Sequence, residues 1–145
     1  MIMTKRQIVA RWIHEVCEEG DMSVLDELLS PTLGANEQVI SNLATRKEIP
    51  LLLDVLHTLI GKMSIEILVF LEDRDWAAVH YKMTSAGPDH ARSVETDGVL
   101  MVRFVDGLIA EIVSQADIMT VFEHLGQLPP DAMLGCFSGQ SLDWK

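Results

Sequence analysis

The stretch GLIAEIVSQADIMTVFEHLGQLP, residues 107–129, decides the fold. It begins on the glycine of an Asp-Gly pair, which is a strong signal for a tight hairpin turn. The apolar residues of 108–116 predict a strand, and those of 118–125 predict a short helix that a glycine then ends. Asp117 stands between strand and helix, where a carboxylate either caps the helix or faces a pocket at the end of a sheet.

The segments before this stretch predict helices first and strands afterwards. Two segments carry a capping box and an apolar stripe at helical spacing, and a short helix lies between them. A run rich in turn formers, 31–44, reads as a loop or a lone edge segment. Three long apolar segments then predict consecutive strands. The predicted helices are 4–20, 21–30 and 45–61, and the predicted strands are 63–72, 76–86 and 92–105.

This order of elements indicates one α+β domain. A long curved antiparallel sheet wrapped around the first and third helices forms a cone with a cavity open at one end, where ligands commonly bind. Gly98 is expected to mark a bulge or bend in its strand, and Arg103 is expected on the outer face of the sheet. We expect the cone to span residues 1–129. The tail, 130–145, is apolar enough to pack on the cone mouth or on a neighbouring subunit.

Composition limits the classes of function. The 145 residues are 48% hydrophobic and 23% charged, which suits a packed domain and argues against disorder. The net charge of −11 disfavours nucleic acid and anionic membrane surfaces as partners, because both would be repelled. Cys17 and Cys136 have no metal-binding or redox spacing, and no run has the length of a signal-peptide core or a membrane span. We therefore expect a cytoplasmic protein without a metal site.

Taken together, the motifs of this chain resemble those of a known family, the SnoaL-like polyketide cyclases, also called ester cyclases, of the nuclear transport factor 2 superfamily. The resemblance covers most of residues 4–129. It is carried by the turn Glu19-Gly20-Asp21, the element Leu25-Asp26-Glu27-Leu28, Gly98 with Arg103, Asp106 and Gly107, and above all Asp117 with the closing Leu125-Gly126-Gln127-Leu128-Pro129.

The resemblance implies a cone of the cystatin-like, nuclear transport factor 2-like type, a homodimer, and a pocket for a small apolar organic molecule. It further implies cofactor-free acid/base catalysis, an aldol-type cyclisation or isomerisation of a polyketide-like or other carbonyl compound, with Asp117 as acid or base. Family members usually carry a tyrosine at Ile13 and a tryptophan at Val113. Related isomerases carry an aspartic acid at Leu100 and a base near Glu37. These four positions are therefore candidates for the pocket lining.

Each candidate also has a purely structural interpretation. Asp117 is either a helix cap alone or a group with a chemical role. Tyr81, on the predicted inner face of its strand, either offers its hydroxyl to the cavity or belongs to the core. Trp12 either packs in the apolar stripe or forms an aromatic wall, and His57 reads as a rim histidine. The alternative function is a non-catalytic small-molecule or partner-binding domain of the same fold.

Overall fold

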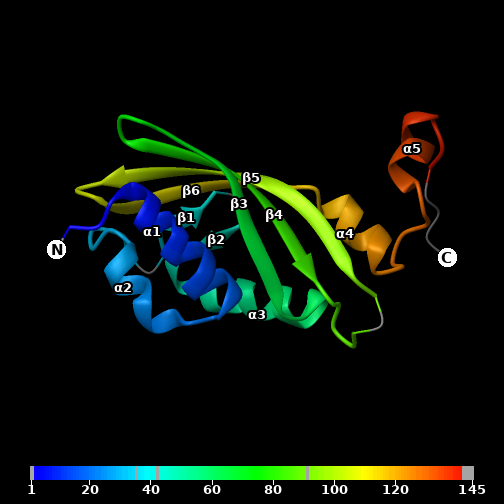
Figure 1. Cartoon of the computed structure of the whole chain (residues 1–145), viewed down its shortest axis with the longest axis horizontal. Helices are drawn as coiled ribbons and strands as arrows, with labels where there is room; N and C mark the ends of the chain where they lie inside the picture. Colours follow the sequence, from blue (N-terminus) through cyan, green and yellow to red (C-terminus); the bar gives the residue numbers. More distant parts are fainter. Residues whose placement is uncertain (1, 35, 42, 91, 142–145) are drawn as a thin grey trace.

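The computed structural model describes residues 2–34, 36–41, 43–90 and 92–141. Helical segments lie on one side of a long curved sheet, and two short helices end the chain (Figure 1). The helical segments are α1 (Lys5–Arg11), η1 (Trp12–Glu18), η2 (Met22–Val24), α2 (Leu25–Leu28), η3 (Arg46–Glu48), α3 (Ile49–Ile60), α4 (Ile118–His124) and α5 (Ala132–Phe137). The strands are β1 (Gln38–Ile40), β2 (Ala44–Thr45), β3 (Met63–Asp73), β4 (Trp76–Ser85), β5 (Val94–Val105) and β6 (Leu108–Ala116).

The first helix begins as its sequence predicts and then widens. The Gln7 amide donates to Oγ1 of Thr4 and the Thr4 amide to Oε1 of Gln7, which confirms the capping box. From Trp12 onward the helix is a π-helix, which the sequence did not predict. The amide of Glu19, for example, bonds the carbonyl five residues back at 3.1 Å.

The sheet has six strands in the order β2-β1-β6-β5-β4-β3. The hairpins from β3 to β6 are antiparallel, whereas β1 lies parallel to β6. The segment expected to be a loop or a lone edge, 31–44, contains β1 and the first residue of β2. The Asp106-Gly107 turn is confirmed, with φ of 52° and 82°. The α+β cone predicted from the sequence is therefore the observed fold.

A β-bulge in β6 changes which residues face the interior. Arg103 of β5 pairs with Glu111, but the next residue, Phe104, pairs with Ile109. Ala110 is thus an extra residue in β6, and Ile109 and Ala110 are both buried. The prediction of a bulge at Gly98 was wrong, because Gly98 pairs in regular register with Tyr81 and with Ala116.

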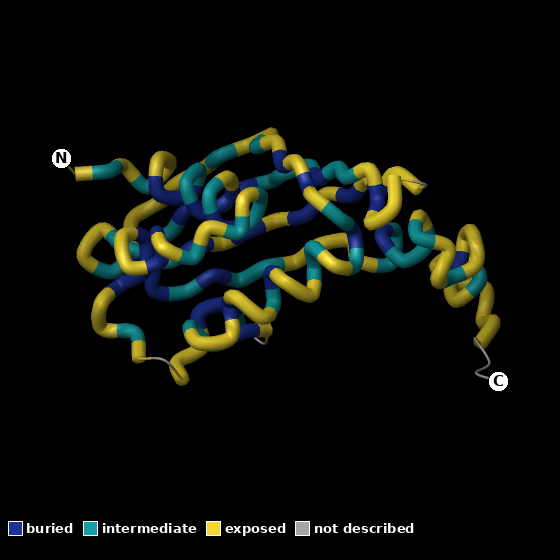
Figure 2. The backbone as a smooth tube through the Cα atoms, turned by 90° about the horizontal axis from the view of Figure 1, so that it is seen from below, coloured by how far each residue is buried: buried dark blue, intermediate teal, exposed yellow. Residues whose placement is uncertain are grey.

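The core fills the space between the helices and the inner face of the sheet (Figure 2). Side chains of β5 alternate between the two faces, and Thr96 and Leu100 are among those on the inner face. Arg103 lies on the outer face, as expected, and donates from Nε to Oε1 of Glu111 at 3.1 Å. The inner face therefore supplies one wall of any cavity within the cone.

The C-terminal helix α5 lies beyond α4, at the far end of the molecule from α1 (Figures 1 and 2). Its apolar side chains Met133, Leu134 and Phe137 are exposed. The tail residues Leu142 and Trp144, also expected to pack, lie outside the described residues. Among the helices of the described part, none has the length and apolar character needed to cross a membrane.

Candidate functional site

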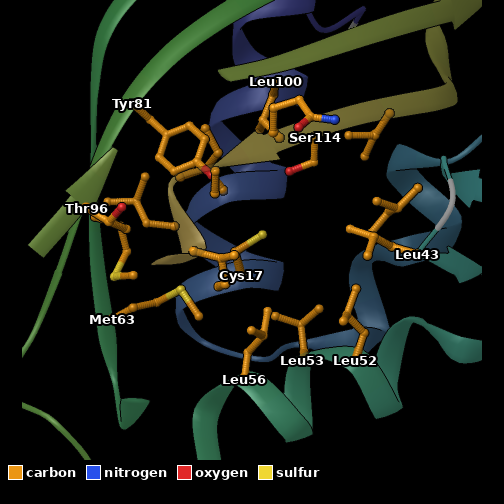
Figure 3. Close-up of a pocket in the computed structure, with 18 of the residues that line it drawn as sticks. Cys17, Leu43, Leu52, Leu53, Leu56, Met63, Tyr81, Thr96, Leu100 and Ser114 are labelled. Atoms are coloured by element: carbon orange, nitrogen blue, oxygen red, sulfur yellow. The ribbon is translucent and has the colours of Figure 1, made fainter. Parts of the chain in front are cut away.

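A cavity of about 470 Å³ lies inside the cone. Its walls come from the first helix, the turn between β1 and β2, α3, and strands β3 to β6. Figure 3 shows the sheet on one side and the leucines of α3 on the other, with Cys17 of the first helix between them. The volume is within the usual range for small-molecule sites.

The floor of the cavity is the apolar face of α3. A capping box sets the start of this helix, where the Thr45 amide donates to Oε1 of Glu48 at 3.0 Å. Leu52, Leu53 and Leu56 then recur at helical spacing and point into the cavity (Figure 3). This wall offers only hydrocarbon to a ligand.

The π-helix supplies the second wall through Trp12, Ile13 and Cys17. Bonding between residues five apart brings positions separated by four and five residues onto one side of the helix. The Cys17 sulfur points into the cavity (Figure 3). Removal from water raises the pKa of the Cys17 thiol to about 12, and the neighbouring charge of Glu18 acts in the same direction.

The sheet wall carries Tyr81 of β4, Leu100 of β5 and Ser114 of β6. Burial raises the pKa of the Tyr81 phenol, while hydrogen bonding by Ser114 opposes that shift. A Cβ atom at Gly98 would lie 2.5 Å from the Tyr81 hydroxyl oxygen and 2.7 Å from the carbonyl oxygen of Gln115. Glycine is therefore needed at position 98 because Tyr81 lies against its backbone.

No charged side chain lines the cavity among the described residues. The lining contains neither Asp or Glu nor Lys, Arg or His, and its polar residues carry hydroxyls, one thiol, one amide and the indole N–H of Trp12. A charged ligand buried here would have no counter-ion, at a cost of several kcal/mol. The arrangement thus favours an uncharged, mainly apolar ligand.

The mouth of the cavity lies between the β1–β2 turn and the start of α4. Leu43 and Ile118 line the cavity and are still 56% and 43% exposed, so the cavity reaches solvent between them. Asp117 is exposed beside this mouth and caps α4. Its Oδ1 accepts from the Thr120 amide at 3.2 Å and its Oδ2 from the Thr120 hydroxyl at 2.6 Å. Its backbone is fixed to β5, because Thr96 donates to the Asp117 carbonyl at 2.8 Å.

Of the seven pocket-lining residues expected from the sequence, four line the cavity. These are Tyr81, Trp12, Ile13 and Leu100.

The other three, Val113, His57 and Glu37, are not among its lining residues. Val113 lies on the outer face of β6, since the bulge turns Ile112 and Ser114 inward. His57 donates from Nε2 to the Cys17 carbonyl at 2.7 Å, because a carbonyl can only accept, and so holds α3 to the first helix. Glu37 is exposed ahead of β1.

Sequence reasoning missed three features of the lining. Cys17 was assigned to the apolar stripe, and its position about one turn after Trp12, where the π-helix begins, gave no sign of a cavity. Ser114 lies two residues after Ile112 and so faces the same side of the sheet. That this side is the inner one follows only once the bulge is known. The inward leucines of α3 were predicted as one helical face, but not as a cavity wall.

Comparison with known proteins places the chain in a family. The SnoaL-like domain model matches residues 9–112, and no curated protein sequence matches the chain. Among solved structures, TsrD from Streptomyces laurentii is 18% identical, with a TM-score of 0.70 over 85% of this chain and 95% of that chain. A protein from Jannaschia, provisionally named a SnoaL-like polyketide cyclase, is 18% identical, with a TM-score of 0.68 over 86% of this chain and 92% of its own.

A third solved structure, from Catenulispora acidiphila, is described as having a ketosteroid isomerase-like fold and was determined with trimethylamine. It is 14% identical, with a TM-score of 0.69 over 89% of this chain and 98% of its own. At these identities the likeness concerns the fold alone. The family model, in contrast, spans the first helix, α3 and the sheet as far as β6, so the chain belongs to the SnoaL-like domain family.

Proposed function

We propose that this protein binds a small, uncharged and largely apolar organic molecule inside the cone. The observation that carries this proposal is the cavity lining, which holds no charged side chain among the described residues. A ligand that buries about 200 Å² of apolar surface gains roughly 5 kcal/mol before the costs of association. The leucines of α3 and the wall from the first helix supply that surface.

The proposal predicts that blocking the floor of the cavity abolishes uptake of an apolar probe. N-phenyl-1-naphthylamine is uncharged and fluoresces strongly in apolar surroundings. The substitution Leu56→Trp adds an aromatic ring at a position that points into the cavity (Figure 3), so the affinity is expected to fall about tenfold or more, ~1.4 kcal/mol or more of binding free energy. Fluorescence titration of both proteins measures the two dissociation constants.

The matched control is Leu51→Trp, which places the same ring on the exposed side of α3, where Leu51 is 63% exposed. This variant is expected to bind the probe like the unaltered protein. Equal affinities for all three proteins would mean that the probe binds at the surface, and the proposal would then be rejected.

A second candidate function is cofactor-free acid/base catalysis on a carbonyl compound, polyketide-like or other, with Asp117 as acid or base. It is favoured by the position of Asp117 in the chain between Ala116 and Ile118, which both line the cavity. A carboxylate there is near a ligand at the mouth, and it can remove a proton next to a carbonyl group.

This candidate is tested by exchange of the α-protons of 1-tetralone in deuterated water, followed by NMR. Asn at position 117 still caps a helix but takes up no proton, so Asp117→Asn is expected to lose any exchange that the protein catalyses while keeping its melting temperature. Catalysed exchange that persists unchanged in Asp117→Asn would remove Asp117 from this role.

We also propose that the protein works as a homodimer in the cytoplasm. Four apolar side chains are exposed on the outer sheet face, on the two strands that flank β4, and a second copy would cover them: Val69 and Leu71 of β3, and Val99 and Met101 of β5. The exposed apolar side chains of α5 would likewise be removed from water if they packed on a neighbouring subunit. The two unpaired cysteines suit a reducing compartment.

A further inference from the structure

The hydroxyl groups in the cavity differ in whether their protons are already donated. Thr96 donates from Oγ1 to the carbonyl of Asp117 at 2.8 Å, and Ser41 donates from Oγ to Oε2 of Glu111 at 3.1 Å. Both protons are therefore engaged within the protein. Tyr81 and Ser114, by contrast, interact with each other, and within the described part of the chain no further hydrogen-bond partner is found for the Tyr81 hydroxyl.

Two hydroxyl groups that share one hydrogen bond retain one proton to donate elsewhere. Each of Tyr81 and Ser114 has a single O–H donor, so even where one donates to the other, one proton is left for a ligand. Tyr81 lines the cavity and is only half-buried. Figure 3 shows both oxygens on the sheet side of the cavity, opposite the leucines of α3. Because burial raises the pKa of Tyr81, the phenol keeps its proton at neutral pH.

The Tyr81 hydroxyl is also held in place before any ligand arrives. Gly98 is the cross-strand partner of Tyr81, and the Tyr81 ring lies against it. The hydroxyl oxygen occupies the space that a Cβ atom at position 98 would need. Packing of an aromatic ring over a cross-strand glycine restricts the ring, so little conformational entropy is lost when the hydroxyl donates to a ligand. The first helix faces it through Cys17, which offers only a neutral thiol.

We infer that the Tyr81 hydroxyl is the donor that selects and orients a neutral ligand with a hydrocarbon body by its hydrogen-bond-accepting oxygen. This inference rests on the proposed binding function and adds an orientation to it. The ligand oxygen lies against the sheet wall at Tyr81, and the hydrocarbon body lies on Leu52, Leu53 and Leu56 of α3. Carboxylates are excluded because no cation lines the cavity among the described residues.

The test uses a pair of probes of nearly equal shape, 9-fluorenone and its hydrocarbon fluorene, each competing with N-phenyl-1-naphthylamine. The intact protein is expected to bind the ketone about fivefold more tightly than the hydrocarbon, the effect of one hydrogen bond. The substitution Tyr81→Phe keeps the ring and is expected to reduce that ratio to about one without changing the affinity for fluorene. Thr84→Val, which removes a hydroxyl of the same strand that does not line the cavity, is the control and is expected to keep the ratio.

The possible outcomes separate the two proposals. If N-phenyl-1-naphthylamine does not bind to the intact protein, or if neither fluorene nor 9-fluorenone displaces it, the binding function fails and the inference fails with it. If both compounds compete but the ratio is the same in the intact protein and Tyr81→Phe, the binding function stands and the role of Tyr81 is refuted. The role of Tyr81 is also refuted if the preference for 9-fluorenone over fluorene is lost in Ser114→Ala but kept in Tyr81→Phe. A melting temperature measured for each variant identifies any loss of folding.

Discussion

Cys17 in the folded protein is expected to react with 4,4′-dithiodipyridine about fiftyfold more slowly than the same thiol in the unfolded chain. Burial raises the pKa of Cys17 from 9.0 to about 12, which lowers the thiolate fraction at pH 8 about a thousandfold. A thiolate of higher pKa is a better nucleophile, and with a Brønsted coefficient of ~0.45 this returns a factor of about twenty. The net effect is therefore about fiftyfold, before any steric hindrance by the cavity walls.

The pH dependence of the rate gives the sign of the effect. The pKa is raised on folding, so between pH 7 and 10 the native rate is expected to rise about tenfold per pH unit without a plateau. The unfolded reference should level off above pH 9. The measurement is the release of 4-thiopyridine from a Cys136→Ser variant, which retains only Cys17, in buffer and in guanidinium chloride.

The reciprocal variant, Cys17→Ser, retains only Cys136, which is exposed on α5 and free of disulfide bonding. Its reaction is expected to be nearly as fast in buffer as in guanidinium chloride. If Cys17 reacted as fast in the folded protein as in the unfolded chain, its thiol would not be removed from water in the cavity wall formed by the π-helix.

The substitution Gly98→Ala is expected to lower the free energy of unfolding by about 2–3 kcal/mol. The added methyl carbon would lie 2.5 Å from the Tyr81 hydroxyl oxygen and 2.7 Å from the Gln115 carbonyl oxygen. The Tyr81 ring could turn aside, but the carbonyl belongs to the backbone of the neighbouring strand and cannot move without breaking the β5–β6 pairing. Urea denaturation followed by circular dichroism measures the change.

Two further variants distinguish this clash from the general cost of replacing glycine. At Gly34 the nearest atoms to an added methyl carbon belong to the flexible Glu37 side chain, at 3.9 Å and beyond, so Gly34→Ala should change stability by no more than ~1 kcal/mol. Adding Tyr81→Phe to Gly98→Ala should restore part of the lost free energy of unfolding, because it removes the hydroxyl oxygen that lies nearest to the added methyl carbon. A Gly98→Ala protein as stable as the Gly34→Ala protein would show that the Tyr81 ring is not held there.

Local sequence signals were sufficient for most of the fold. The stretch 107–129 folds as its residues predict: the Asp-Gly turn, β6, the Asp117 cap and the short helix before Gly126 are all observed. Turn chemistry and capping act over a few residues, and no tertiary contact overrides them here. The π-helix, in contrast, has the same apolar spacing as an ordinary helix would, so the pattern of Trp12, Ile13 and Cys17 could not reveal it.

The site was harder to predict because it depends on register between distant strands. Tyr81 was correctly placed inward from the alternation along a single strand without a bulge, whereas the parity of β6 depends on an extra residue that only the pairing with β5 reveals. The parallel pairing of β1 with β6 depends likewise on contacts far apart in sequence. Asp117 was found from its local setting, and its role in chemistry remains a prediction.

The extra residue Ala110 has a consequence for how such a site diversifies. The bulge lets residues of opposite odd–even position face the interior on its two sides, Ile109 before it and Ile112 and Ser114 beyond it. Loss of the Ala110 codon would leave Phe104 paired with Ile109 and Arg103 paired with Glu111, so the strand would become regular while Ser114 still faced the cavity. In a cone of this kind, a strand can gain or lose one residue at a bulge while its cavity wall stays the same, and alignments that ignore the gap would compare inward with outward side chains.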